Sequence, residues 1–355
     1  MYTQDEINLI TFSSFDSLSY NIKYALLSKL SSSEPDFVKY ENILIKTLTD
    51  GVYNKVKAKF YDPDYRKALL DGLEKRGIKC VTYFSEGYPE SLKNISDPPV
   101  NLFCKGDISL LKSRCFSIVG SRRSTPKCIA DTKKLSGEIA QQFTVVSGMA
   151  EGADTAAVEG AIENGKVISV LAYGFDYTYP AVNANLIKSV AEKGLLVSEH
   201  PPKIKPQGYM FPFRNRIIAG LSQGTLMVSA GIKSGALITA NYAADYGRDV
   251  FVFPYYPGTT SGAGCNYLLK NGAIPAENIL DIFKEFGLDF NKPKAATLTE
   301  DESQVLSAVK DSGEALLAQI ADKLNKPAYK LIPIIASLEI KGLVVNLGGN
   351  RYSAV

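Results

Sequence analysis

The sequence contains a single histidine, His200, and its five cysteines form no CxxC pair. One histidine cannot supply a histidine-rich metal site and leaves little room for a Ser-His-Asp triad, which disfavours hydrolytic catalysis. An odd number of widely spaced cysteines argues against a disulfide framework or a zinc site. We therefore expect no metal, no catalytic residues, and buried thiols at Cys80, Cys104, Cys115, Cys128 and Cys265.

Long apolar runs are also missing from the chain. None approaches the roughly 20 residues that span a bilayer. The first residues include Asp5 and Glu6 and lack the basic and apolar regions of a signal peptide. We therefore expect a cytoplasmic protein without a membrane segment. Because 40 basic and 37 acidic residues give a net charge of only +3, any affinity for nucleic acid must come from a local basic patch.

The middle of the chain shows a repeating pattern of strands and helices. Short runs rich in β-branched residues alternate with helix-length patterns, which predicts successive βαβ units. The runs are almost continuously apolar, as in a sheet buried on both faces. We therefore expect an α/β fold with a Rossmann-like, doubly wound and mostly parallel sheet. The expected strands are Cys115–Val119, Thr144–Ser147, Val167–Ala172, Leu195–Ser198, Thr225–Ser229 and Asp249–Phe253.

Smaller domains are expected on either side of this sheet. Apolar residues at helical spacings before residue 78 predict a small helical domain. Near the end of the chain, helices followed by two strands around Gly348-Gly349 predict a winged helix. The expected parts are a helical domain (1–77), a connecting segment with one strand at Cys80–Tyr83 (78–112), the Rossmann-like domain (113–288), a linker (289–296) and the winged helix (297–355).

Three turns near the predicted strand ends carry groups that bind anions. They are Val119 to Arg123, Ser147 to Asp154, and Phe211 to Arg216. Since the carboxyl ends of parallel strands meet at one crevice of the sheet, we expect these turns to be neighbours. Backbone amides, helix N-termini and guanidinium groups together suit a phosphate-bearing ligand. The chain lacks GxGxxG and a Walker A lysine, so we expect no dinucleotide, ATP or other small-molecule cofactor.

Structural roles compete with binding at some of these positions. Asp154 suits the N-cap of the following helix better than a ligand contact. Arg214 and Arg216 stand two residues apart and do not share a helix face. One of them can reach the crevice while the other supports the fold, for which a pairing with Glu199 is available. Aromatic residues near the strand ends, Phe211 among them, are candidates for base stacking.

Together these motifs resemble the DNA-processing protein A family, also called DprA or Smf. Members of that family protect incoming single-stranded DNA in natural transformation and load the RecA recombinase on it. The resemblance rests on several long motifs in the right order, namely Val119–Arg122, Ser147–Asp154, Tyr179-Pro180, Ser198-Glu199, Phe211-Pro212, Arg214–Ser222, Ser234–Ala240, Gly247-Arg248, Gly264–Asn266 and Gly272-Ala273.

The resemblance implies a non-enzymatic homodimer whose partners are single-stranded DNA and RecA. The family's phosphate pocket carries over onto Gly120, Ser121, Arg122, Ser147, Gly148, Arg214, Asn215 and Arg216. We add Arg123, Phe211 and Lys188. Many members carry a basic residue where this chain has Ala181, so that phosphate contact is either missing here or supplied by Lys188 or Lys205. About four neutralised phosphates predict that log affinity falls with log salt at a slope near −3. Dimer contacts are expected at Asn266, Leu268, Leu269 and Ile274.

Two other classes of function remain open at the level of sequence. Rossmann-like nucleotide phosphoribohydrolases use a glutamate and an arginine, roles that Glu199 and Arg216 would take here. The Pro-Gly-Gly-x-Gly-Thr loop of those enzymes is absent from the chain. A transcriptional or signalling adaptor would depend on the winged helix, whose third helix offers few basic residues for groove recognition.

Overall fold

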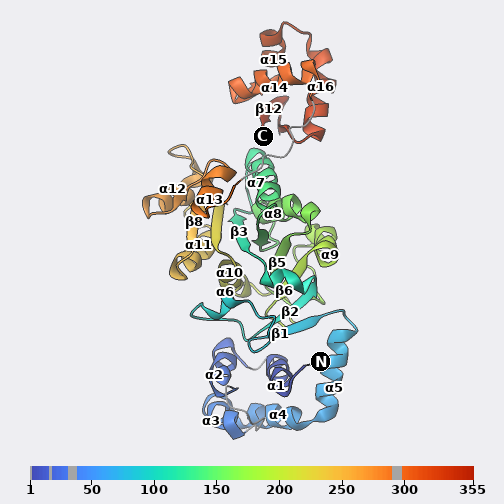
Figure 1. Cartoon of the computed structure of the whole chain (residues 1–355), viewed down its shortest axis with the longest axis vertical. Coiled ribbons are helices and arrows are strands. Elements are labelled where there is room, and N and C mark those ends of the chain that lie inside the picture. Colours follow the sequence, from blue (N-terminus) through green and yellow to red (C-terminus); the bar gives the residue numbers. More distant parts are fainter. Residues whose placement is uncertain (1, 16–17, 31–37, 290–297) are drawn as a thin grey trace.

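The computed structural model describes residues 2–15, 18–30, 38–289 and 298–355. A nine-stranded sheet with its helices occupies the middle of an elongated chain (Figure 1). Helices α1–α5 lie at one end and α14–α16 at the other. The expected linker, 289–296, falls outside the described residues except for Asp289.

The central sheet has the strand order β1-β2-β6-β5-β4-β3-β7-β8-β9. Strands β3 to β9 run parallel, whereas β1 and β2 pair antiparallel at one edge. The expectation of a mostly parallel α/β sheet is confirmed, and the six expected strands end within one residue of their predicted limits. The strands are β1 Lys79–Thr82, β2 Asn101–Gly106, β3 Cys115–Gly120, β4 Thr144–Ser147, β5 Val167–Leu171, β6 Leu195–Ser198, β7 Gly224–Ser229, β8 Asp249–Val252 and β9 Ile274–Pro275.

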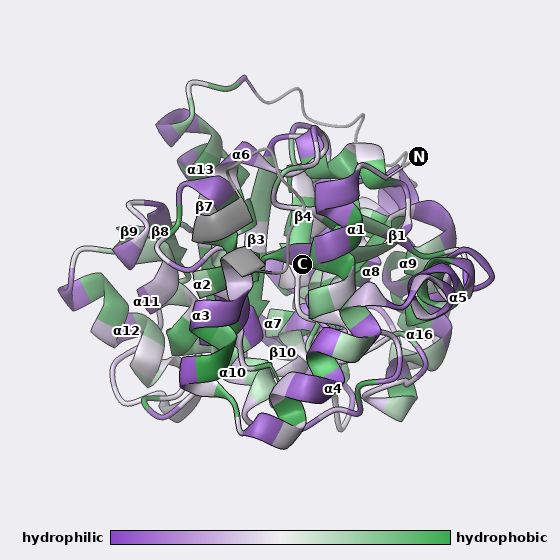
Figure 2. Cartoon of the chain, turned by 90° about the horizontal axis from the view of Figure 1, so that it is seen from below, coloured by the Kyte–Doolittle hydropathy of each residue, from purple (hydrophilic) through white to green (hydrophobic). Residues whose placement is uncertain are grey.

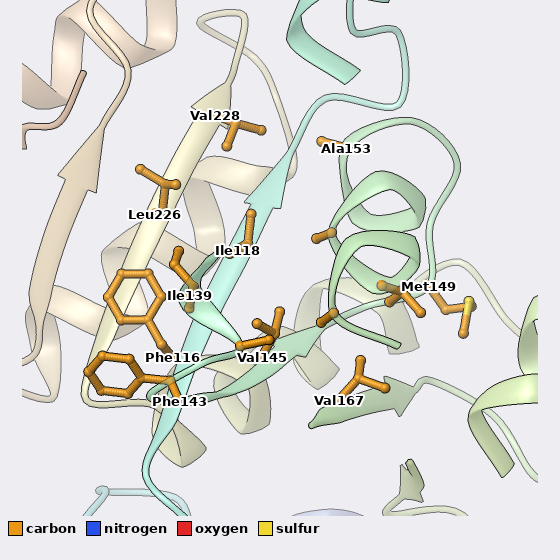
Figure 3. Close-up of a cluster of buried hydrophobic side chains, with 14 of the residues drawn as sticks. Phe116, Ile118, Ile139, Phe143, Val145, Met149, Ala153, Val167, Leu226 and Val228 are labelled. Carbon is orange, nitrogen blue, oxygen red and sulfur yellow. The ribbon is translucent and has the colours of Figure 1, made fainter. Parts of the chain in front are cut away.

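Burial on both faces explains why the central strands are almost entirely apolar. Along β3, Phe116 and Ile118 point into one hydrophobic cluster, while Cys115 and Val119 point into another on the opposite face. This alternation is the period of two that a pleated strand imposes. Figure 3 shows the first cluster, in which Phe116 and Ile118 lie among side chains from β4, β7 and helices α7 and α8. All five cysteines are free and buried, as expected.

Helices follow the strands and cover both faces of the sheet. Helix α7 begins directly after the β3 turn, where Thr125 caps the Cys128 amide and Pro126 occupies the first helical position. The helices of this part are α6 Glu90–Lys93, α7 Pro126–Ile139, α8 Ala153–Ala161, α9 Ala184–Lys193, α10 Met210–Leu221, α11 Ala236–Asp245, α12 Ala263–Lys270 and α13 Ile279–Glu285. Short 3-10 helices are η1 Ile108–Lys112, η2 Ile162–Asn164, η3 Ala181–Asn183 and η4 Thr260–Gly262.

The two ends of the chain have hydrophobic cores of their own. At one end lie α1 Gln4–Ser13, α2 Tyr20–Leu30, α3 Val38–Thr47, α4 Asp50–Tyr61 and α5 Pro63–Glu74. At the other, α14 Glu300–Ser312, α15 Leu317–Leu324 and α16 Ala328–Ile340 pack with β10 Glu314–Leu316, β11 Val344–Gly348 and β12 Arg351–Ala354. Figure 2 shows that α5 is largely hydrophilic, while central strands such as β3 are hydrophobic. Among the described residues, no helix has the length and apolar character needed to cross a membrane.

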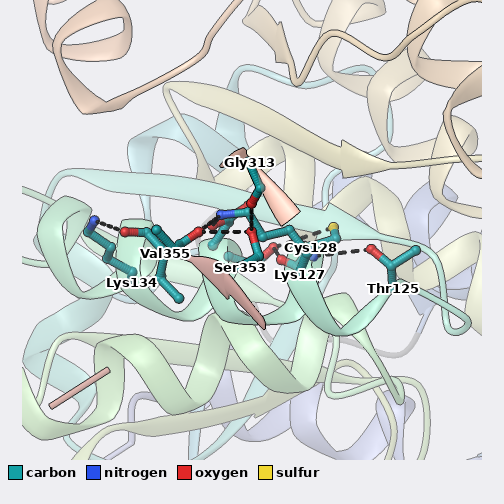
Figure 4. A network of polar contacts seen from close by, with 10 residues as sticks. Thr125, Lys127, Cys128, Lys134, Gly313, Ser353 and Val355 are labelled. Atoms are coloured by element: carbon teal, nitrogen blue, oxygen red, sulfur yellow. Dashed lines mark hydrogen bonds and ion pairs between the residues drawn. The ribbon is translucent and has the colours of Figure 1, made fainter. Parts of the chain in front are cut away.

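The last module meets the sheet domain through polar contacts on α7. Lys127 donates to the carbonyl of Ala354, and Lys134 donates to the carbonyl of Val355 at 2.9 Å (Figure 4). Its sheet has three strands in the order β10-β12-β11, one more than the sequence suggested. The extra strand, β10, is only three residues long, too short for the alternation of side chains to show.

Candidate nucleic-acid interface

A pocket of about 550 Å³ opens at the carboxyl ends of the central strands. The chain passes from β3 through β4, β5 and β6 on one side, and continues with β7, β8 and β9 on the other. The order therefore reverses between β3 and β7, which is where open α/β sheets bind their ligands. The lining comes from the connections that follow β3, β4, β5, β6 and β7 and from helices α8, α10 and α11. It consists of Val119, Gly120, Ser121, Arg122, Arg123, Ala150, Asp154, Tyr179, Gly208, Phe211, Pro212, Arg214, Asn215, Ile218, Ser234, Gly235, Ala236 and Thr239.

The turn after β3 places two exposed arginines at the pocket mouth. A Cβ on Gly120 would lie 2.7 Å from the Cβ of Ala153, so only glycine allows this close approach of the turn to α8. Ser121 holds the turn, because its amide donates to Ser229 Oγ at 3.1 Å and its Oγ accepts from the Arg123 amide at 3.1 Å. Among the described residues neither Arg122 nor Arg123 forms an ion pair, so both guanidinium groups are available to an anion.

Arg214 lies at the buried floor of the pocket. Its Nη1 donates to the carbonyls of Gly148, at 2.6 Å, and of Val170, and its Nε donates to Asn215 Oδ1 at 3.2 Å. Burial lowers the pKa of this guanidinium, and the nearby carboxylate of Asp154 acts in the opposite direction. Arg214 therefore serves both as a fixed positive charge beneath the pocket and as a brace between α10 and the ends of β4 and β5.

Asp154 does not cap its helix, contrary to the sequence-based preference. Helix α8 begins at Ala153, its N-cap is Gly152, and the Asp154 side chain turns back to accept from the Ala150 amide at 3.4 Å. Burial raises the pKa of this carboxyl, while Arg214 and the amides of the surrounding turns lower it in part. The carboxylate thus occupies amides of the β4 turn that the sequence suggested would face a phosphate.

Aromatic rings form one wall of the pocket. The Tyr179 and Phe211 rings lie 5.3 Å apart between centroids, and the Arg122 guanidinium lies 6.0 Å from the Phe211 centroid. Tyr179 is 42% exposed and Tyr209, nearby in sequence to Phe211, is 69% exposed. Exposed rings beside arginines suit the stacking of bases whose phosphates are held by the guanidinium groups.

Comparison with known proteins shows the family to which the chain belongs. Residues 79–287 match the sequence model of DNA recombination-mediator protein A, more than half of the chain. The chain belongs to this family. Among relatives, the DNA processing protein DprA of Bacillus subtilis is 40% identical over 220 residues, covering 61% of this chain and 74% of that protein. Protein Smf of Escherichia coli is 33% identical over 302 residues, covering 80% of this chain and 79% of that protein.

Solved structures of family members share the fold. The Streptococcus pneumoniae DprA crystal structure superposes with a TM-score of 0.69 at 30% identity, covering 82% of this chain and 99% of that one. The Helicobacter pylori DNA processing protein A, solved in a study of its single-stranded DNA binding mode, superposes with a TM-score of 0.55 at 31% identity. That match covers 60% of this chain and 97% of the other.

In this member of the family, the pocket gathers most of the residues expected to bind DNA, but not all of them. Gly148 lies beside it, in a small adjoining cavity with Arg122 and Tyr179. Ser147 is fully buried and donates to the Ile118 carbonyl at 2.8 Å, so it supports β3 and does not reach the pocket. Lys188 is exposed on α9 but does not line the pocket.

Arg216 was expected at the pocket, and the structure corrects this. Its side chain is fully buried, and Nη2 donates to both carboxylate oxygens of Glu199 at 2.7 Å. The structural pairing that the sequence allowed for one of the two arginines is thus the role of Arg216. Arg214 and Arg216 have different roles because they stand two residues apart on α10. This spacing turns Arg216 away from the face that carries Arg214.

Sequence reasoning missed pocket residues that carry no charge or ring. Gly208 and Ile218 line the pocket without any feature that distinguishes them from packing residues. Asn215 is nearly buried, and its Nδ2 donates to the Gly235 carbonyl at 3.4 Å. It therefore ties α10 to the turn before α11 at the rim of the pocket.

The residues expected at a dimer interface lie near the edge strand β9. Leu268 is buried in the core, and the Asn266 side chain exchanges hydrogen bonds with the Tyr255 backbone at 3.2 and 3.0 Å. Leu269 and Ile274 are half-buried. Exposed large side chains in this region include Tyr256, at 84%, and Tyr267, at 50%.

Proposed function

We propose that this protein binds single-stranded DNA and acts as a recombination mediator. The observation that carries the proposal is the pocket at the β3/β7 switch, where Arg122 and Arg123 are exposed and unpaired among the described residues. Guanidinium groups grip phosphates through two parallel hydrogen bonds. Beside them, Tyr179 and Phe211 offer faces for bases of any sequence. The DNA processing proteins that resemble this chain support the same role.

The proposal includes the finer features of the family. The protein would protect the strand and load RecA on it in the cytoplasm during natural transformation, as a homodimer that adds avidity along one strand. The helices before residue 78 would form a separate domain joined by residues 78–112 to the Rossmann-like domain (113–288). Residues 297–355 would be a winged helix, for which three helices and a three-stranded sheet give support. No chemical step is assigned to the pocket.

The enzymatic alternative finds no support in the geometry. A nucleotide phosphoribohydrolase would need Glu199 and Arg216 free to meet a substrate, whereas Arg216 is fully buried and forms an ion pair with Glu199 at 2.7 Å. Incubation with nucleoside monophosphates should therefore release no free base, and release of base by the purified protein would restore this alternative.

Titration of a labelled dT oligomer against the protein at two salt concentrations tests the proposal. Saturable binding that weakens as salt rises supports it, because phosphate contacts release counterions. An identical oligomer in duplex form serves as the control, since its bases are not available for stacking. Absence of binding at low salt, or equal binding of single strand and duplex, would contradict the proposal.

A further inference from the structure

Arg216 sits in an enclosure formed by residues from distant parts of the chain. Its guanidinium carbon lies 4.1 Å from the ring centroid of Phe213 and 4.7 Å from that of Tyr20, which comes from α2. Glu199, just after β6, accepts two hydrogen bonds from Nη2. Burial acts to lower the pKa of Arg216, but Glu199, Tyr20 and Asp97 raise it overall, so the group stays charged.

The ring faces compensate for hydrogen bonds that Arg216 does not make. Among the described residues, its Nε and Nη1 are buried without a hydrogen-bond partner. Asp97 Oδ2 lies 3.6 Å from Nε, an ion pair without hydrogen-bond geometry. A desolvated guanidinium over an aromatic face is attracted electrostatically to the negative face of the ring. Tyr20 and Phe213 are therefore part of what keeps this charge buried, and the Tyr20 hydroxyl fixes its ring by donating to the Pro98 carbonyl at 3.2 Å.

The residues around Arg216 also contact both helices that line the DNA pocket, α10 and α11. Arg216 belongs to α10, whose opposite face presents Arg214 to the pocket. Asp97 also accepts from the hydroxyl of Tyr246, the residue that ends α11. The N-terminal turn of α11 contributes further lining residues. One buried cluster thus touches α10, α11, α2 and the segment around Asp97 that leads into β2.

We propose that Arg216 is a positioning residue that orients α10 and α11 for strand binding, and that Tyr20 makes the affinity of the pocket depend on the N-terminal helices. This inference rests on the proposed function. Neither residue touches the strand. Removing the Tyr20 ring frees Arg216 to shift, and α10 then carries Arg214 and Phe211 away from the positions that bind phosphate and base.

The test compares three full-length variants by anisotropy titration of a labelled dT oligomer over a range of salt. Replacing Arg216 directly leaves the half-buried Glu199 without its partner, so the informative change is Tyr20→Ala at the half-buried edge of the cluster. We expect Tyr20→Ala to weaken binding about fivefold or more, within the energy of the lost cation–π contact. Tyr20→Phe keeps the ring and should bind within about twofold of the unchanged protein.

The salt slope separates positioning from direct contact. Because neither Tyr20 nor Arg216 meets a phosphate, the slope for Tyr20→Ala should equal that of the unchanged protein, whereas Arg122→Ala should lower it. Thermal unfolding that stays cooperative shows that the variant is folded during the titration. Unchanged affinity in folded Tyr20→Ala, or a lowered slope, overturns the positioning role. Failure of the unchanged protein to bind would instead overturn the proposed function.

Discussion

Replacing Arg122 by alanine tests the phosphate pocket through the salt dependence of binding. The structure leaves Arg122, Arg123 and the buried Arg214 at the pocket and removes Arg216 from it. At about 0.7 per phosphate for a single strand, three contacts give a slope of log affinity on log salt near −2, instead of the −3 expected from four. Arg122→Ala should bring the slope to about −1.4. Losing even one of the two charge-assisted hydrogen bonds that a guanidinium makes to a phosphate costs about 1.5 kcal/mol, so affinity at low salt should fall at least roughly tenfold.

Arg114 provides the matched control for this measurement. It is an exposed arginine directly before β3, at the opposite end of the strand that delivers Arg122. Six residues of strand separate the two positions by about 20 Å. That distance exceeds the Debye length of about 10 Å at 0.1 M salt. Arg114→Ala should therefore keep both slope and affinity. Equal slopes for Arg122→Ala and the unchanged protein, measured by anisotropy with a dT oligomer, would refute the pocket.

Three further predictions address the pocket and the last module. Gly148→Ala should impair binding, because its Cβ would lie 2.6 Å from Arg214 Nη2. Gly51→Ala, on α4 outside the pocket and with open space at its Cβ, should bind normally, and equal titrations of the two variants would contradict this. Phe211→Ala should lose about 1–3 kcal/mol of strand affinity at an unchanged salt slope, and a changed slope would argue against stacking. Hydrogen bonds from Lys341 and Ser337 hold the pKa of Glu302 at about 2, below its ordinary 4.5. This lowered pKa stabilises the last module above about pH 4.5, a contribution lost as pH falls toward 2. Glu302→Gln should accordingly speed hydrogen exchange in α14 and α16 at pH 7. Unchanged exchange would contradict the stabilising role of the Glu302 carboxylate.

The sequence was sufficient to predict the parallel sheet because its central strands are buried on both faces. Their apolar runs, such as Val167 to Leu171, carry a signal that does not depend on distant partners. The antiparallel edge of the sheet was harder to predict. Strand β2 follows the Asp97-Pro98-Pro99 segment, and no pattern in its own residues indicates that it pairs with β1 and β6. Strand β9 has only two residues, too few for any periodicity.

At the site, the sequence predicted which turns meet but not which side chains remain free. Turn chemistry after β3 and β4 is local, so Gly120 and Gly148 could be recognised from their neighbours in the chain. The partners of charged groups are not local. Arg216 meets Glu199 and Tyr20, and Asp154 turns back on the Ala150 amide, only because the fold brings those groups together. Helix geometry therefore predicted that the two arginines of α10 point in different directions, but it could not predict which of them faces the pocket.

Photo-crosslinking of a 5-iodouracil-substituted dT oligomer, followed by peptide mapping, tests the central claim most directly. Iodouracil bases that stack on a ring form adducts with it when irradiated, so the adducts report where the strand lies. Binding at the β3/β7 switch predicts adducts on Phe211 or Tyr179, and their loss when Arg122 is replaced by alanine. Adducts confined to α1–α5 or to the module after residue 297 would contradict the account.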